Sequence, residues 1–388
     1  MKIYLRKNEH RRIKAGHLWV FSNEIDYTED FSLNGCISDL YSNNKNFLGR
    51  GIYNKNSLIA FRLLSYRRED INKDFFIQAF KTADNKRKKY FENNFYRLVN
   101  GESDFLPGLI IDRFNDNFSI QIFSLGLENI KGTIVNALID LFSPECIIER
   151  NDFEYRQLEG LESVKKILFG NPPSELIAET DNIKYNIDLL EGQKTGFYFD
   201  QRKNRYKIRE FVKRDDEVLD VFSNDGGFGL NALYSGAKNV TFIDSSDYSL
   251  RNCEINCTLN KFRNFAVEKG DAFEILKRYV KESRMFDIII LDPPSFTKSR
   301  KNIKSAEAGY IEINSCAMKL AKPHSIIFTF SCSHHISWKI FEDIIVRSAY
   351  SAGRRIEIIG NSEISPDHPV LPQMPETKYL KGFILLVN

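Results

Sequence analysis

The stretch FDIIILDPPSF, at residues 286–296, joins an apolar run to residues that could hold a planar ring. Residues 288–291 are all apolar, which is typical of a buried strand in a parallel sheet. Proline lacks an N–H and fixes φ, so the two prolines after Asp292 must end this strand. Asp292 is therefore expected at the carboxyl end of a strand, where open α/β sheets bind ligands. An acid, two prolines and Phe296 in this place suit a pocket for a flat ring.

A glycine-rich turn follows the predicted strand at 217–222. The sequence SNDGGFG, at 223–229, puts glycines in a first β–α turn, where they let a nucleotide cofactor approach the backbone. The full G-x-G-x-x-G dinucleotide fingerprint is missing. A pyrophosphate favours bare N–H groups at a helix start, whereas this turn offers Asp220 and Asp225. Carboxylates suit a cofactor that carries an ammonium and a sulfonium, which favours S-adenosylmethionine over NAD.

Two further acids extend the predicted cofactor edge. Asp244 ends the second predicted strand, where it could accept hydrogen bonds from both ribose hydroxyls, and Asp271 follows the third, where it could bind the adenine amino group. Each could instead be a helix N-cap, but three acids at three consecutive strand ends are less readily explained as three caps. The predicted cofactor-binding residues are Asp220, Phe222, Ser223, Asp225, Gly226, Gly227, Asp244, Ser245, Asp271, Ala272, Asp292 and Pro293.

These residues need a doubly wound α/β sheet to position them. Residues 217–388 alternate strand-like and helical patterns, which predicts such a parallel sheet. Short β-like runs before residue 67 predict a small β barrel, and a helix from about 72 to 91 begins a central α/β insert. A chain of 388 residues exceeds one ordinary domain. The predicted domains are 1–67, 68–181 and 182–388.

The net charge of +3 is unevenly distributed. Residues 1–68 hold 12 Lys and Arg against 6 Asp and Glu, a net charge of +6. Arg11, Arg12 and Lys14 precede Trp19, and positive charge beside an aromatic ring is common in RNA binders. A basic module points to a polyanion partner, although an ordinary solvated surface explains the charge equally well. Trp19 by itself fits a core residue better than a platform for a base.

Six cysteines are scattered without the spacing of a disulfide framework or a zinc site, so no metal centre is predicted. No stretch approaches the roughly 18 consecutive apolar residues of a membrane span. The N-terminal residues lack the apolar core of a secretory signal. We therefore expect reduced thiols and a cytoplasmic location.

The sequence resembles the class I S-adenosylmethionine-dependent methyltransferases and, more closely, the PUA-domain large-subunit ribosomal RNA cytosine-5 methyltransferases. One departure is Ser223-Asn224-Asp225, where relatives commonly have Cys-Tyr-Thr. The resemblance covers nearly the whole chain and implies a Rossmann-like methyltransferase domain, a PUA-like RNA-binding domain, S-adenosylmethionine and a ribosomal RNA substrate. The matching motifs, in the order of the family, are GHLWVF (16–21), LPGLIIDRF (106–114), GQKTGFYFDQR (192–202), LDVFSNDGGFGLNAL (219–233), DPPSF (292–296), FTFSCS (328–333) and DHPVLPQMPETKYLKGF (367–383).

Under this reading Cys332, just past the fifth predicted strand, is the catalytic nucleophile. Its thiolate would add to C6 of cytosine and make C5 enamine-like, while Asp292 would bind N3 and the amino group of the base. Nearby positive charge would favour the thiolate, and His334 and His335 are candidates. Pro294 stands where many RNA cytosine-5 enzymes have a second cysteine, so the group that removes the C5 proton is open. The alternative for Cys332 is a small buried hydrophobe.

Basic and aromatic side chains could hold the RNA around this site. The GQKTGFYFDQR segment could roof the pocket or be a structural hairpin, and Phe296 could stack on the base or simply pack. The candidate RNA-binding residues are Arg11, Arg12, Lys14, Lys194, Arg202, Phe296, Lys298, Arg300 and Lys301. Two rival functions are left open: methylation of an exocyclic amine of adenine or guanine, which would not need Cys332, and a non-catalytic RNA-binding assembly factor. A homodimer is also left open.

Overall fold

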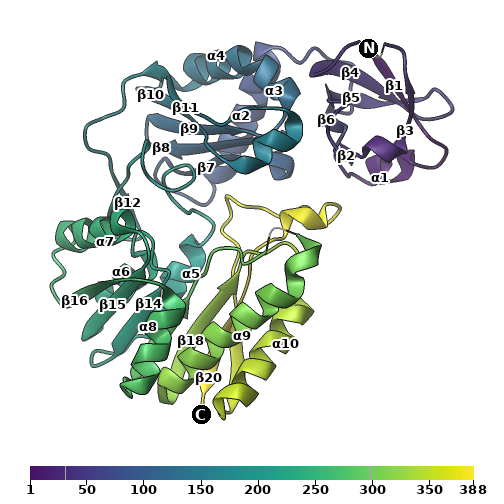
Figure 1. Ribbon diagram of the computed structural model, residues 1–388. Helices are drawn as coiled ribbons and strands as arrows, with labels where there is room; N and C mark the ends of the chain where they lie inside the picture. The colour runs from purple at the N-terminus through teal and green to yellow at the C-terminus, as the bar shows by residue number, and fades with distance from the viewer. Residues whose placement is uncertain (31, 298) are drawn as a thin grey trace. The chain divides into compact units, whose positions relative to one another are not determined.

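The computed structural model describes residues 1–30, 32–297 and 299–388 (Figure 1). The chain forms two compact units. The first unit comprises Met1–Ala178, Ile187–Phe199 and Pro366–Lys378. The second comprises Glu179–Asn186, Asp200–Ser365 and Tyr379–Asn388. No helix among the described residues is long and apolar enough to cross a membrane.

The first unit begins with a six-stranded sheet in the order β2-β6-β5-β4-β1-β3, which confirms the predicted N-terminal β domain. Its strands enclose a core that includes Leu18, Leu40 and Phe61. Trp19 packs at the margin of this core and its Nε1 donates to Glu102 Oε1 at 3.0 Å, as expected of a structural residue. The elements are β1 (Lys2–Leu5), α1 (His10–Lys14), β2 (Trp19–Val20), η1 (Ser22–Glu24), β3 (Ile25–Thr28), β4 (Cys36–Tyr41), β5 (Phe47–Tyr53) and β6 (Phe61–Ser65).

A second sheet of the first unit has the order β11-β10-β9-β8-β7. Helix α2 begins at its N-cap Asn72 and buries Phe76 and Phe80. It ends at Arg87, four residues before the predicted end, and the guanidinium of Arg87 donates to Asp104 and to the carbonyl of Arg97. The elements are α2 (Lys73–Arg87), β7 (Phe95–Asn100), η2 (Gly101–Asp104), β8 (Leu109–Phe114), β9 (Asn117–Ile122), α3 (Leu125–Asn129), α4 (Lys131–Phe142), β10 (Cys146–Asn151), η3 (Glu154–Glu159) and β11 (Val164–Gly170); the short η6 (Pro375–Thr377) also belongs to this unit.

The second unit is built on a seven-stranded sheet in the order β16-β15-β14-β17-β18-β20-β19. Five neighbouring strands of this sheet run parallel, which confirms the Rossmann-like fold. In sheet order they are β16, β15, β14, β17 and β18. The late strand β20 departs from the predicted parallel arrangement, because it is antiparallel to both β18 and β19. The strands are β14 (Glu217–Val221), β15 (Asn239–Asp244), β16 (Phe265–Lys269), β17 (Phe286–Leu291), β18 (Ala321–Ser331), β19 (Ile356–Asn361) and β20 (Lys381–Val387). A separate two-stranded sheet pairs β12 (Ile177–Thr180) with β13 (Ile183–Asn186).

Alternate side chains of the large sheet face two layers of helices. Leu219, Ile289 and Ile327 belong to the core that also contains the buried faces of α8, α9 and α10, and Figure 1 shows these three helices beside one another. Phe242 and Phe330 point to the opposite layer, where they meet α6. The helices are α5 (Arg202–Lys207), η4 (Ile208–Glu210), α6 (Gly227–Tyr234), α7 (Asp247–Leu259), α8 (Ala272–Lys281), η5 (Arg300–Asn302), α9 (Ile303–Leu320) and α10 (Trp338–Ala352).

Candidate active site

The carboxyl ends of neighbouring parallel strands meet at one edge of the large sheet. Val221 at the end of β14 pairs with Leu291 at the end of β17, and Leu291 pairs with Thr329 of β18. The residues that follow these strands, Asp292 and Cys332 among them, therefore share this edge. The backbone N–H of Asp292 donates to the carbonyl of Val221 at 3.4 Å, which fixes the start of the DPPSF turn.

The turn after β14 is strained. Phe222, Asn224 and Gly226 all have left-handed backbones, with φ of 62°, 46° and 78°. An aromatic residue with positive φ is a conformational outlier, and such outliers persist only where neighbours impose them. Here the N–H of Ser223 donates to the carbonyl of Ile243 at 3.0 Å. The turn is thus held against the end of β15.

Gly227, at the start of α6, allows close packing behind the turn. A Cβ at this position would lie 2.5 Å from Nε of Arg205. Arg205 belongs to α5 and is buried, so it has little room to withdraw. The glycine is required at this place by the close approach of α5 rather than by its own φ.

Asp220 is a buried carboxylate at the carboxyl end of β14. Its Oδ2 accepts a hydrogen bond from the N–H of Gly229 at 2.8 Å, and its Oδ1 has no hydrogen-bond partner among the described residues. Burial, more than any neighbouring charge, raises the pKa of Asp220 to about 8. An orphaned carboxylate oxygen at a cofactor edge fits a ligand that brings a donor or a positive charge, as S-adenosylmethionine does.

Asp225 is also buried, but two side-chain amides already engage it. Its Oδ1 accepts from Asn252 Nδ2 at 2.9 Å and its Oδ2 from Asn224 Nδ2 at 3.0 Å. Asn256 of the same helix, α7, donates to the carbonyl of Asp225 at 2.9 Å. Burial raises the pKa of this carboxyl group as well. Its observed contacts tie the turn to α7.

Asp244 and Asp271 lie at the ends of the next two strands. Asp244 accepts from the N–H of Ser246 at 2.9 Å through Oδ1 and from the N–H of Asn224 at 3.0 Å through Oδ2. Asp271 caps α8, because its Oδ1 accepts from the N–H groups of Phe273 and Glu274 at 2.9 and 3.2 Å. Asp271 is nevertheless exposed, so a ligand at the sheet edge could still reach its carboxylate while the residue caps α8.

Cys332 and the DPPSF turn lie side by side. Sγ of Cys332 is 3.9 Å from the carbonyl oxygen of Pro293, and the side chains of Cys332 and Asp292 are both partly exposed. The sulfur is therefore not buried away from the acid. The two candidate catalytic residues occupy adjacent turns of one edge, although they are 40 residues apart in the sequence.

A group of hydroxyls joins these two turns. Ser295 Oγ lies 2.9 Å from Ser333 Oγ, and the hydroxyl of Tyr310 lies 3.0 Å from Ser333 Oγ. Ser331 Oγ donates to the same tyrosine hydroxyl at 3.0 Å. Burial raises the pKa of Tyr310 to about 12, so the hydroxyl stays protonated and can donate. The network fixes the position of Cys332 relative to the DPPSF turn.

Gln201 is a contact that sequence reasoning missed. Its Nε2 donates to Asp292 Oδ1 at 2.9 Å, and its own Oε1 accepts from Asn204 Nδ2 at 2.7 Å. The chain of amides orients the carboxylate of Asp292. The only sequence signal was the place of Gln201 inside the GQKTGFYFDQR motif, where the charged Arg202 drew attention instead.

Phe296 packs against other rings. Its centroid lies 6.4 Å from Phe222, 5.7 Å from Phe273 and 4.5 Å from Tyr310. These contacts favour the packing alternative for Phe296 over stacking on a base. Through Phe222, the ring also supports the strained cofactor turn.

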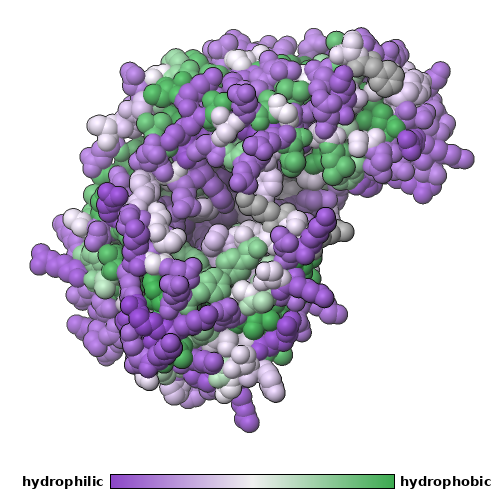
Figure 2. Space-filling model, in the orientation of Figure 1, coloured by the Kyte–Doolittle hydropathy of each residue, from purple (hydrophilic) through white to green (hydrophobic). Residues whose placement is uncertain are grey.

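The basic residues proposed to bind RNA differ in how far their side chains are exposed to solvent. Arg11, Lys14, Lys194 and Lys301 are exposed, and Figure 2 shows that hydrophilic side chains cover most of the visible face. Arg12 is partly exposed, and its Nη2 pairs with Glu24 at 2.9 Å.

Three further basic residues proposed to bind RNA are not among these exposed side chains. Arg202 is buried at the start of α5 rather than exposed at the surface. Lys298 lies outside the described residues, as does the side chain of Arg300.

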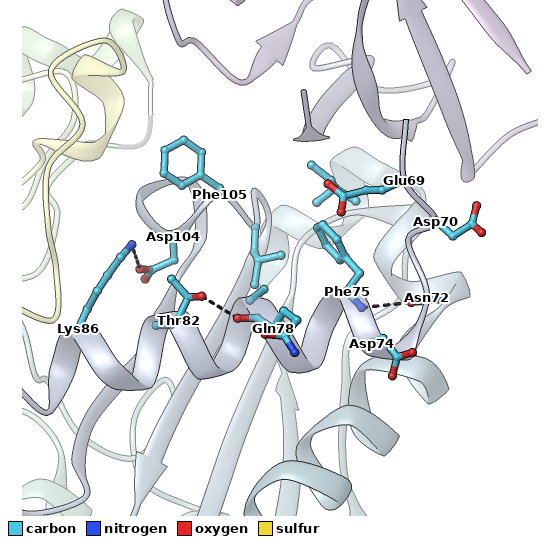
Figure 3. A pocket seen from close by; sticks show the side chains of 14 residues that line it. Glu69, Asp70, Asn72, Asp74, Phe75, Gln78, Thr82, Lys86, Asp104 and Phe105 are labelled. Atoms are coloured by element: carbon cyan, nitrogen blue, oxygen red, sulfur yellow. Dashed lines mark hydrogen bonds and ion pairs between the residues drawn. The ribbon is translucent and has the colours of Figure 1, made fainter. Parts of the chain in front are cut away.

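A separate cavity of about 460 Å³ lies in the first unit, beside α2 (Figure 3). Its lining is acidic, with Glu69, Asp70 and Asp74 near one end of the helix. Lys86 is 3.5 Å from Asp104, which also binds Arg87. None of the predicted catalytic or cofactor residues lines this cavity.

Two family descriptions match parts of the chain. A PUA-like domain matches residues 3–66, and a family described as conserved hypothetical protein 95 matches residues 200–325. Three similar relatives are named ribosomal RNA large subunit methyltransferase I. Those of Vibrio vulnificus and Vibrio cholerae are 37% identical over 98% of each chain, and that of Aliivibrio fischeri is 37% identical over 99% of this chain and 98% of its own.

Solved structures share the fold. A Streptococcus mutans protein assigned as a SAM-dependent methyltransferase matches with a TM-score of 0.84 at 22% identity over the whole of both chains. A second protein assigned as a methyltransferase and complexed with SAH matches with a TM-score of 0.86, also at 22% identity and over the whole of both chains. At this identity the likeness concerns the fold.

Proposed function

Since the chain belongs to the ribosomal RNA large subunit methyltransferase I family, we propose that it methylates C5 of a cytosine in large-subunit ribosomal RNA. One observation carries the proposal: the partly exposed sulfur of Cys332 lies 3.9 Å from the DPPSF turn that bears Asp292. A thiol and a carboxylate at adjacent strand ends are the groups that activation of cytosine requires.

The thiolate of Cys332 adds to C6 of the base, which makes C5 enamine-like and nucleophilic. As the neutral acid, Asp292 donates its proton to N3, accepts a hydrogen bond from the amino group of the cytosine and so neutralises the negative charge that develops on the ring during this addition. Because Gln201 holds Oδ1 of Asp292, the carboxyl group meets the base in one orientation. After methylation at C5, loss of the C5 proton and expulsion of the thiolate restore the ring.

The cofactor is S-adenosylmethionine, whose sulfonium supplies the methyl group when it is bound. We assign it to the strand edge between Asp220 and Asp271, with Asp244 between them. The Oδ1 of Asp220, which has no hydrogen-bond partner among the described residues, supports this assignment. A positively charged ligand would offset the free-energy cost of burying a negative charge on this carboxylate. The turn residues Phe222 to Gly227 would complete the site.

Substitution of the thiol tests the proposal. Cys332→Ala should lower the rate of RNA methylation by at least about a thousandfold, since the covalent step is lost. Cys316→Ala, at another partly buried cysteine, should keep the rate within about twofold. Methyl transfer to unmodified large-subunit RNA and mass spectrometry of its nucleosides provide both readouts.

The rival functions predict different results. Full activity in Cys332→Ala, with the methyl group found on an exocyclic nitrogen, would establish the amine methyltransferase instead. RNA binding without any calorimetric binding of S-adenosylmethionine would establish a non-catalytic assembly factor. RNA that contains 5-fluorocytidine should form a covalent complex with the intact chain and none with Cys332→Ala, because fluorine blocks the final elimination.

We further propose that residues 1–67 are an RNA-binding domain, 68–181 a central domain and 182–388 the methyltransferase domain. The match of a PUA-like domain to residues 3–66 and the exposed Arg11 and Lys14 support the first assignment. The double substitution of Arg11 and Lys14 by Glu should weaken RNA binding and flatten its salt dependence. Lys45→Glu, at another exposed lysine of the same sheet domain, is the matched control.

A further inference from the structure

Lys381 is a buried lysine beside the turn that carries Cys332. It begins β20 and pairs in register with Ser331 at the end of β18. The residue is 3% exposed. Its Nζ donates to the carbonyl of Ser333 at 3.0 Å and to the carbonyl of Tyr379 at 2.5 Å. The ammonium thus grips the backbone just after Cys332.

No carboxylate of the described residues lies within ion-pair distance of this ammonium, whereas most buried lysines are paired. Burial lowers the pKa of Lys381 to about 8, and the one charge that opposes this shift is that of Cys332. Nζ binds the carbonyl of Ser333 and Lys381 pairs with Ser331, so the backbone contacts of this lysine flank Cys332 on both sides. Carbonyl oxygens alone would leave the charge uncompensated.

The remaining ionisable groups near this pair are already engaged with other partners. The hydroxyl of Tyr310 bonds to Ser331 and Ser333, and Gln201 binds Asp292. Asp200 accepts from the hydroxyl of Tyr379 at 2.6 Å, which steadies the carbonyl that holds Nζ. The ring of exposed His334 lies 5.7 Å from the ring of Tyr379.

We propose that Lys381 is the positioning residue that holds Cys332 as a thiolate. The inference rests on the proposed function, in which Cys332 is the nucleophile. The ammonium stabilises the thiolate, so the thiol releases its proton to solvent and the resting pair is a thiolate beside an ammonium. The sulfur then uses its lone pair to form the bond to C6, and it takes that pair back when the bond breaks at the end of turnover.

This role differs from the one expected for His334 and His335. A histidine loses its charge near neutral pH, whereas a lysine with a pKa of about 8 is still mostly charged there. The lysine is also held by backbone carbonyls on both sides, so its position is fixed before RNA binds. The DHPVLPQMPETKYLKGF motif contains this lysine, and pairing of β20 with β18 brings it to the site.

The test measures the reactivity of the thiol itself. Iodoacetamide alkylates thiolates, so the rate at each pH reports the thiolate fraction of Cys332 when its peptide is followed by mass spectrometry. In the intact chain the rate should reach half its maximum at least one pH unit below the ordinary value of about 8.5 for a free thiol. A half-maximum at that ordinary value would overturn the proposal without any variant. Cys36, a partly exposed thiol of the other unit, is the internal reference.

Two variants sharpen the result. Lys381→Met should slow alkylation of Cys332 at pH 7 by about tenfold or more and move its half-maximum upward, whereas Lys381→Arg keeps a cation and should restore most of the effect. The same order should appear in kcat at pH 7, with KM for RNA unchanged. Identical alkylation profiles in all three proteins would refute the role of Lys381.

Failure of this inference can be told from failure of the proposed function. If Cys332→Ala still methylates RNA, the nucleophile assignment is wrong, yet the alkylation profile still reports whether Lys381 acts on the thiol. If Cys332→Ala is inactive and Lys381→Met leaves the profile of Cys332 unchanged, only the inference about Lys381 fails. Circular dichroism of each variant confirms that it is folded.

Discussion

Individual buried charges set the chemistry of this site at the scale of the residue. Asp220 and Lys381 are both buried, and burial moves their pKa values toward each other, to about 8 in each case. Among the described residues, Asp220 forms no ion pair with a basic side chain and Lys381 forms none with a carboxylate. Each therefore costs stability in its charged form and offers that charge to a ligand or a nucleophile.

Asp220→Asn should weaken binding of S-adenosylmethionine by roughly tenfold, because the acceptor with the unused oxygen loses its charge. The pKa of Asp220 is raised from 3.8 to about 8, so its neutral form stabilises the native state at low pH and this contribution is lost as pH rises through 8. Asparagine does not ionise. As the pH rises from 3.8 to about 8, the melting temperature of Asp220→Asn should therefore increase relative to that of the intact chain, as calorimetry can measure. A difference in melting temperature that stays constant over this range would contradict the raised pKa.

Lys381→Met should shift stability in the alkaline range. The pKa of Lys381 is lowered from 10.5 to about 8, so the intact chain carries the full cost of a buried ammonium below pH 8 and loses that cost as pH rises to 10.5. Methionine carries no such cost. Between pH 8 and 10.5, the free energy of unfolding of the intact chain should rise by roughly 1–3 kcal/mol relative to that of Lys381→Met, as denaturant unfolding can measure. A difference that does not depend on pH would show that the lysine titrates normally.

Single elements of the fold position these residues. The turn between β14 and α6 combines three left-handed residues with a glycine that α5 approaches closely. The hydroxyl network of Ser295, Tyr310 and Ser333 joins the turn after β17 to the turn after β18. Because short loops on a rigid sheet carry both turns, small changes behind them should alter catalysis without unfolding the protein.

Gly227→Ala should test the close packing of α5 against the cofactor turn. The added Cβ would lie 2.5 Å from Nε of buried Arg205, so α5 or the turn must move, at a cost of about 1–3 kcal/mol. We expect weaker binding of S-adenosylmethionine by calorimetry. Gly132→Ala is the matched control, since no atom lies within 4 Å of its Cβ and it sits in α4; it should be neutral or stabilising by up to about 1 kcal/mol. Equal behaviour of the two variants would refute the packing argument.

At the scale of the whole molecule, buried polar networks hold the first unit together. Glu159 of η3 lies 4% exposed and accepts from Asn54 Nδ2 at 2.8 Å and from Arg62 Nη2 at 2.8 Å. The N–H of Leu125 donates to the same carboxylate at 3.3 Å, and Ser57 Oγ also bonds to it. One side chain thus links the N-terminal sheet domain to the segment that follows β10.

Glu159→Ala should destabilise the first unit by about 3–5 kcal/mol, because it leaves the guanidinium of Arg62 buried without a counter-charge. Glu29→Ala removes an exposed partner of Lys2 and should change the stability far less, because solvent screens this pair. Denaturant unfolding of both variants measures the contrast. Comparable losses would show that burial does not decide the strength of these pairs.

The sequence by itself determined the local features of this protein. Apolar runs ended by prolines, glycines and acids predicted the parallel strands, and they placed Asp220, Asp244 and Asp292 at the ends of those strands. The helix from 72 was predicted four residues too long, since residues 88–90 form turns although the apolar spacing continues to Phe91. Periodicity reports what a residue does within its own element, which is why these features could be predicted.

Only the tertiary structure decided which side chains meet. The antiparallel insertion of β20 beside β18 brings Lys381 to the backbone after Cys332, and the packing of α5 brings Gln201 to Asp292. The burial of Arg202, a candidate RNA contact, follows from the same helix. Contacts between residues tens of positions apart depend on strand order and helix placement, and the spacing of residues along the chain does not encode these.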